Sequence, residues 1–272
     1  MTADTLVAPF QLTYQGWSGF VVDSVDRPPL LFDPSPDVTL DTYPMVIAIT
    51  HGHPEHVRGT LAHIVRTDRS AVAVVASRNV CRFLARRSAC SGDRFFPVDV
   101  GAELDVDGWK IRIFAWRHMT LLPPGVWNSV RHLWKIFTHP IRLAGVGLQS
   151  LNGPRHAPML GFHVTAPGSP GPLAYIGEGL HRMTTRAELD AAFGGKRVHT
   201  LIAGVEPEDT EQIPGILAGQ PIDHVILFEP HRIWREQFGM QQADVSGLVR
   251  RLRESGFQCD APKPSDRSRR SL

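Results

Sequence analysis

The chain has 272 residues, 42% of them hydrophobic and 21% charged, which is enough to bury a sizeable core in one large α/β domain. Its 29 basic and 27 acidic residues leave a formal charge of only +2, which does not favour a nucleic-acid surface. No apolar run reaches the ~18 residues of a membrane span, and residues 1–10 lack the pattern of a secretory signal.

Cysteine usage and charge together favour small-molecule partners in a reducing compartment. Cys81, Cys90 and Cys259 are widely spaced and form no Cys-x-x-Cys pair. Neither a disulfide framework nor a cysteine zinc site is therefore indicated. We expect a cytoplasmic protein.

The hydrophobic pattern predicts two β-rich openings, each followed by alternating helices and strands. Strands are predicted first over 11–15, 19–23 and 30–33, as a hairpin and meander, then over 45–50, 71–76, 95–98 and 109–116. Helices 56–66 and 78–87 lie between them. A second hairpin over 161–166 and 172–176 precedes helices 185–193, 210–218 and 244–255 and strands 198–204 and 224–228. This order predicts a sandwich of two sheets with helices outside, in a single domain over 1–264 with a disordered tail at 265–272.

Four metal-ligating side chains follow the predicted strand 45–50. They are His51, His53, Glu55 and His56, in the pattern His-x-His-x-Glu-His. Imidazole nitrogen is the commonest biological ligand for zinc, and a carboxylate adds a harder oxygen and negative charge. The alternative is a solvated histidine-rich loop, which such a concentration of ligands at one strand end disfavours.

Three later side chains occupy similar places at predicted strand ends. His118, Glu178 and His231 follow strands 109–116, 172–176 and 224–228. Because the carboxyl ends of strands in α/β sheets open to ligands, we expect all seven side chains to converge on two metal ions.

This ordered series resembles the metallo-β-lactamase-fold hydrolases, whose signature is His-x-His-x-Asp-His followed by a distant His, a distant Asp and a final His. The resemblance covers nearly the whole chain. Four motifs are similar to the branch with ascorbate-phosphate lactonase-like and phospholipase D-like enzymes: Leu31-Phe32-Asp33-Pro34, Thr50-His51-Gly52-His53, Trp116-Arg117-His118-Met119-Thr120 and Tyr175-Ile176-Gly177-Glu178. The resemblance implies a four-layer αββα sandwich of two mixed β-sheets flanked by helices.

By position, the resemblance implies a first metal ion held by His51, His53 and His118. It implies a second ion held by Glu55, His56 and His231, with Glu178 bridging the two. Two cations lower the pKa of bound water, so the implied reaction is hydrolysis of an ester, lactone or phosphodiester bond by a metal-bridging hydroxide, without an organic cofactor.

The chain departs from the family at Glu55 and Glu178, where Asp is usual. Each change adds a methylene and alters the reach of the carboxylate. Two zinc ions are the leading expectation, but this ligand set also suits iron or manganese. A di-iron or di-manganese oxidoreductase is therefore the alternative function, and a metal-binding protein without turnover is a third.

Further polar residues are candidates for the same site. We take Glu55 and His181 as the candidate catalytic side chains, since His181 follows Glu178 by three residues and is an alternative ligand or substrate contact. Asp33 is predicted to orient a histidine ligand. Glu206, Glu208 and Asp209 either line the pocket or mark a solvated helix N-terminus.

The segment 121–158 interrupts the expected fold as an insertion. Apolar residues recur there at helical spacing, at Trp127, Val130, Trp134, Phe137 and Ile141, and predict an amphipathic helix with basic residues between them. It packs on its own domain or on a second copy in a homodimer, covers an apolar or anionic small-molecule substrate as a lid, or makes weak contact with a membrane surface. Ser129, Asn152, Arg155 and His156 are candidates to face the pocket.

Overall fold

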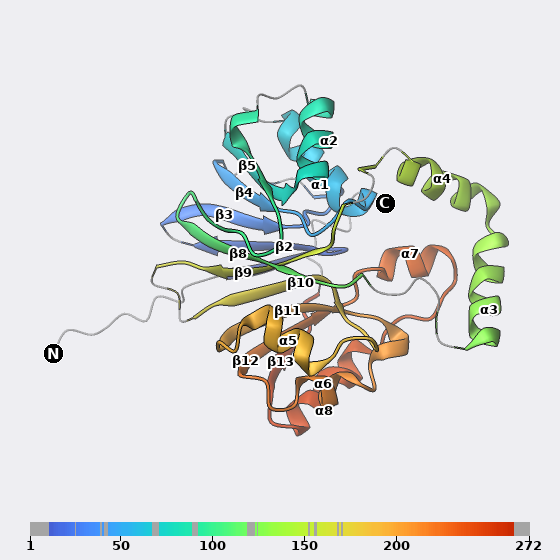
Figure 1. Ribbon diagram of the computed structural model, residues 1–272. Helices are drawn as coiled ribbons and strands as arrows, with labels where there is room; N and C mark the ends of the chain where they lie inside the picture. Colours follow the sequence, from blue (N-terminus) through green and yellow to red (C-terminus); the bar gives the residue numbers. More distant parts are fainter. Residues whose placement is uncertain are drawn as a thin grey trace.

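The computed structural model describes residues 11–263 apart from 25, 39, 41–42, 67–70, 89–91, 119–122, 124, 152, 155–156, 168 and 170. Two β-sheets lie face to face, with helices on the outer side of each (Figure 1). The tail predicted at 265–272 and the pocket candidates Asn152, Arg155 and His156 lie outside the described residues.

The first sheet has the order β1-β2-β3-β4-β5-β6. Its strands are β1 (Gln11–Gly16), β2 (Gly19–Ser24), β3 (Arg27–Phe32), β4 (Met45–Ala48), β5 (Val72–Ser77) and β6 (Phe95–Val98). The first three pair antiparallel, as the predicted meander requires, and β3 to β6 pair parallel.

The second sheet has the order β13-β12-β11-β10-β9-β8-β7. Its strands are β7 (Glu103–Val106), β8 (Trp109–Ala115), β9 (Leu160–Thr165), β10 (Leu173–Leu180), β11 (Val198–Val205), β12 (Ile222–Phe228) and β13 (Gln258–Asp260). Strands β7 to β10 pair antiparallel and β10 to β13 parallel, so both sheets are mixed, as predicted.

Alternating apolar side chains build the layers. In β3, Leu30 and Phe32 point into the core between the sheets, whereas Leu31 joins the outer cluster under the helices. Because side chains alternate across a strand, an apolar run such as this one can fill two layers at once. The αββα sandwich is confirmed.

Helices cover the outer face of each sheet. The first sheet carries α1 (Pro54–Arg66) and α2 (Arg78–Ser88), and the second carries α5 (Arg186–Phe193), α6 (Ile213–Leu217) and α8 (Val245–Glu254). Sequence reasoning missed β7 and α7 (Arg232–Gln237), both too short for a clear periodic pattern. It also ended β10 at residue 176, although the strand continues to Leu180.

The insertion holds two helices where one was predicted. They are α3 (Val126–Phe137) and α4 (Pro140–Leu151), and they stand beside α7 at the edge of the sandwich (Figure 1). The predicted apolar series ran through Pro140, which has no amide hydrogen and instead starts the second helix.

Among the helices of the described residues, none has the length and apolar character needed to cross a membrane.

Candidate metal centre

The loop between β4 and α1 presents His51 with a fixed ring orientation. The Thr50 hydroxyl donates a hydrogen bond to Asp33 Oδ2 (2.7 Å) and lies 2.9 Å from His51 Nδ1. Because that hydroxyl proton is committed to Asp33, His51 Nδ1 must be the donor to Thr50 Oγ1. The other ring nitrogen, Nε2, is then free of a proton and faces Glu178.

Asp33 is buried against this loop and contacts both its backbone and the ring of His56. Its Oδ1 accepts the backbone N–H of Thr50 (2.8 Å), and its Oδ2 lies 3.0 Å from His56 Nδ1. Burial alone would raise the pKa of Asp33, but the adjacent His56 ring lowers it below its usual value. A buried, ionised Asp33 therefore turns His56 Nε2 toward the centre, the kind of role predicted for it.

Glu178 reaches the centre from the middle of β10, flanked by two glycines that its surroundings require. A Cβ at Gly177 would lie 2.7 Å from Asp33 Oδ2. Gly179 has φ +79°, and a Cβ there would lie 1.7 Å from the carbonyl oxygen of Gly204. The pattern Gly-Glu-Gly thus allows β10 to lie close to Asp33 and to β11, where the pairing of the two strands is irregular.

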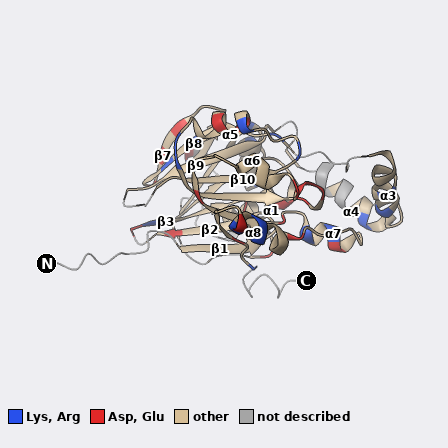
Figure 2. Ribbon diagram, turned by 90° about the horizontal axis from the view of Figure 1, so that it is seen from below, with Lys and Arg blue, Asp and Glu red and all other residues tan. Residues whose placement is uncertain are grey.

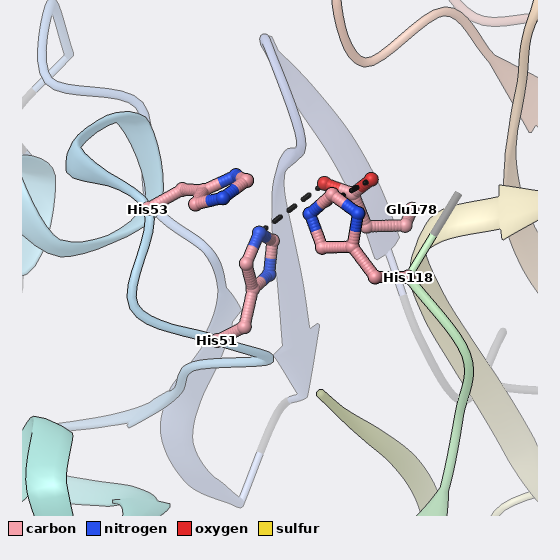
Figure 3. Close-up of side chains that lie close together, drawn as sticks. All are labelled: His51, His53, His118 and Glu178. Carbon is pink, nitrogen blue, oxygen red and sulfur yellow. Dashed lines mark ion pairs between the residues drawn. The ribbon is translucent and has the colours of Figure 1, made fainter. Parts of the chain in front are cut away.

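The Glu178 carboxylate lies among four imidazole rings from three separate segments of the chain. Its Oε1 is 3.2 Å from Nε2 of His51, 3.7 Å from Nε2 of His231 and 3.9 Å from Nε2 of His56. Its Oε2 is 3.6 Å from Nε2 of His118. The ligand atoms of His51, His53, His118 and Glu178 all lie within 4.8 Å of one another (Figure 3).

These residues fit a divalent metal ion. Two ligand atoms at the usual distances from a tetrahedral cation are separated by about 3.3 Å, close to several of the distances above. In addition, His51 Nε2 and both oxygens of Glu178 are buried without a hydrogen-bond partner. Leaving such groups unpaired costs free energy, and a cation between them would satisfy all three.

The electrostatics of the cluster also suit a cation. Burial, followed by repulsion from His56, lowers the pKa of His51 to about 4, and burial lowers that of His53 to about 4. Both rings are therefore neutral near pH 7, the state that binds metals. Glu178 stays ionised because, although burial would raise its pKa, His231 and His51 hold it well below the usual value.

His231 is held by a buried ion-pair network. Its Nδ1 lies 2.7 Å from Glu206 Oε1, and Arg235 contacts the other Glu206 oxygen and also Glu208 Oε2 (3.0 Å). Burial would lower the pKa of His231, but Glu178 and then Glu206 raise it to about 10. Of the two alternatives left open for Glu206, the structure favours a role beside the centre. Arg235 was missed, although its i+4 spacing from His231 was a signal.

The two candidate catalytic residues lie at the margin of the cluster. Glu55, in the first turn of α1, is partly exposed, with Oε1 3.6 Å from His53 Nδ1. His181 is buried, and its Nδ1 accepts a hydrogen bond from the Met183 amide (3.2 Å). The tight four-residue group therefore includes neither of them, and their roles stay predictions.

Comparison with solved structures gives the same architecture. The metallo-β-lactamase fold protein YhfI of Bacillus subtilis superposes with a TM-score of 0.56 at 10% identity, over 94% of this chain and 97% of that one. The protein has the metallo-β-lactamase fold. CmlA, a diiron β-hydroxylase of Streptomyces venezuelae, gives a TM-score of 0.59 at 13% identity, over 94% of this chain and 53% of its own.

Sequence comparison is consistent with this metallo-β-lactamase-fold assignment. A UPF0173 metal-dependent hydrolase of Methanocaldococcus jannaschii is 26% identical over 122 residues, which is 44% of this chain. The match spans about half of that relative, 53% of its length. No family model matches the chain. The broad resemblance to metallo-β-lactamase-fold proteins is confirmed, whereas the narrower branch stays a prediction.

Proposed function

We propose that this metallo-β-lactamase-fold protein is a metal-dependent hydrolase of an ester, lactone or phosphodiester bond. The proposal rests on one observation above all: the unpaired, buried carboxylate of Glu178 lies among the Nε2 atoms of His51, His118 and His231. The metal-dependent hydrolase of M. jannaschii is consistent with this activity.

The division of the ligands between two ions is carried over from the family resemblance. We assign His51, His53 and His118 to one zinc ion and Glu55, His56 and His231 to a second, with Glu178 between them. Bound divalent cations would polarise the scissile group and lower the pKa of water toward neutrality. The chain's own part is to orient these rings, through Asp33 behind His56 and Glu206 behind His231. His231, whose pKa is raised, would release the proton on its Nε2 when a metal binds.

Two pockets, whose described linings contain none of the seven assigned ligands, are compatible with an apolar or anionic small-molecule substrate. One, of about 330 Å³, starts at Pro54 and is lined by apolar side chains and by Arg58 and Arg87. The other, of about 570 Å³, contains His181 together with Arg112 and with Arg117, which pairs with Glu188 in the same lining. We propose that His181, whose Nδ1 is already an acceptor, carries its proton on Nε2 and contacts substrate there.

A di-iron or di-manganese oxidoreductase is the second candidate. The longer carboxylates Glu55 and Glu178 favour it, since hard oxygen ligands with extra reach suit iron and manganese. The structural similarity to a diiron β-hydroxylase is consistent with such a site on this fold.

Metal analysis separates the two candidates. We expect protein purified without added metal to contain two zinc ions and to lack a visible absorption band under air. Stoichiometric iron with charge-transfer absorption would refute the zinc hydrolase. Zinc-, manganese- and iron-loaded protein should then be assayed on phosphodiester, lactone, thioester and β-lactam substrates.

The substitution His53→Ala tests the site itself. We expect loss of metal and of activity, because the ring supplies one of the four clustered ligand atoms. His199→Ala is the matched control, since that ring is partly exposed on β11 and pairs with Asp223 at 3.3 Å. If metal content and activity both survive His53→Ala, the assignment is wrong.

A further inference from the structure

The helical arm, α3 and α4 over residues 126–151, has two distinct apolar faces. One face packs on the protein: Ile136 is buried with Phe238 and Met240, and Leu143 and Trp234 pack against this cluster. Lys135 Nζ also donates a hydrogen bond to the carbonyl oxygen of Gly239 (2.7 Å). The arm thus packs against α7 and the loop after it through a small hydrophobic cluster and one hydrogen bond.

The second face is apolar and open to solvent. Trp127 is 84% exposed, Trp134 69% and Phe137 64%, and Val126 and Val130 lie beside them. At about 100° of rotation per residue, these five positions fall in one sector of α3 about 100° wide. Ile141, at the start of α4, is 88% exposed. Packing on the protein's own domain therefore accounts for the face that contains Ile136, but leaves the face that contains Trp127 and Trp134 exposed to solvent.

Charge in this region has a single sign. The chain carries 27 acidic residues, yet none lies between Asp107 and Glu178. The described part of the arm carries Arg131, Lys135 and Arg142. Arg131 lies next to the exposed sector of α3, whereas Lys135 and Arg142 donate hydrogen bonds to the carbonyl oxygens of Gly239 and Gln237. In Figure 2 the arm accordingly shows basic but no acidic colour.

An exposed tryptophan-rich face, on an arm whose described charged side chains are all basic, matches the composition of helices that lie in a membrane interface. We propose that the outer face of the helical arm, formed by Val126, Trp127, Val130, Trp134, Phe137 and Ile141, docks on the surface of an anionic lipid bilayer. The apolar side chains enter the interface, Arg131 meets lipid phosphates, and the positive charge of the arm as a whole attracts the anionic surface.

Charge argues against a second copy of the chain as the occupant. A two-fold dimer interface pairs the same patch on both subunits. Two copies of this face would bring Arg131 close to its own symmetry mate, without an acidic side chain in the described arm to offset the repulsion. An anionic surface offsets the same charges.

Vesicle co-sedimentation tests the proposal with the full-length protein. We expect binding to vesicles of phosphatidylcholine mixed with phosphatidylserine, weaker binding to phosphatidylcholine alone, and release at high salt. Val126→Ser/Val130→Ser should weaken binding by about tenfold, since two apolar side chains lose their burial. Arg131→Gln should weaken it by about fivefold.

Matched variants elsewhere on the surface serve as controls. Val65→Ser/Val100→Ser removes two valines of comparable exposure, 63% and 53%, and Arg250→Gln removes an exposed arginine of α8. Both controls should bind vesicles as the unmodified protein does. Equal effects of the arm and control variants, or no binding to anionic vesicles, would overturn the proposal. A dimer that dissociates on Val126→Ser/Val130→Ser, without vesicle binding, would assign the face to a second copy and equally overturn it.

Discussion

Asp33→Asn removes the charge under the metal centre with little change in shape. Asp33 has φ +39°, a conformation that Asn adopts readily, so the backbone is not strained by the change. The carboxylate accepts from the Thr50 amide and hydroxyl at 2.8 and 2.7 Å and lies 3.0 Å from His56 Nδ1. An amide has one acceptor oxygen, so its NH₂ group must face at least one of these donors.

The expected loss follows from those contacts. The Tyr175 hydroxyl also donates to Asp33 Oδ2 at 3.1 Å, so an amide with its oxygen at this position keeps three contacts and turns its NH₂ toward the Thr50 amide. A buried group left unpaired costs about 1–3 kcal/mol, so unfolding free energy should fall by roughly that amount. Metal affinity should fall about 10–100-fold, because His56 loses the charged partner that orients it. Urea unfolding of the metal-free protein measures the first quantity, and competition with a chromophoric chelator measures the second.

Asp107→Asn is the matched control. Asp107 also has positive φ, +49°, and pairs with Arg94 at 2.6 Å, but the pair is partly exposed. Its loss should cost less than about 1 kcal/mol and leave metal affinity unchanged. Should Asp33→Asn keep its metal affinity within about twofold of the unmodified protein, then Asp33 does not orient a ligand and the reasoning is refuted.

Two other substitutions test the packing and the acid sensitivity of the fold. Burial, then repulsion from Arg112, lowers the pKa of His163 from 6.5 to about 4, so the unfolded chain takes up a proton that the folded chain does not as pH falls through that window. The protein should therefore lose up to about 2 kcal/mol of stability from this residue between pH 7.5 and 5, and melting temperatures at those two pH values should fall further apart than in His163→Leu; an identical pH dependence in both would contradict this. A Cβ at Gly59 in α1 would lie 1.8 Å from the carbonyl oxygen of Pro34, so Gly59→Ala should destabilise the protein by more than about 2 kcal/mol in urea unfolding and displace the helix that begins beside His53. Gly215→Ala, in α6 with nothing within 4 Å, should be neutral or slightly stabilising, and equal losses at both glycines would show that the contact does not matter.

Much of the fold could be predicted from the spacing of apolar residues within short segments of the sequence. The apolar runs of β3 and β4 fill the core on one side and the helical layer on the other, so their sequence already predicts strands covered on both faces. The ligand positions were predicted in the same way, since His118 and His231 each follow such a strand. β7 and α7 escaped prediction because four to six residues hold too little of either period.

The local sequence determined which side chains end the strands, and with them the chemistry that the site offers. Tertiary structure decided how those side chains meet, because their distances depend on segments far apart in the chain. Glu178 reaches the imidazoles only where Gly177 and Gly179 let β10 pass close to Asp33 and Gly204. Likewise, the helical period predicted an apolar face at 126–141, but only packing against α7 determined which apolar residues remain exposed to solvent.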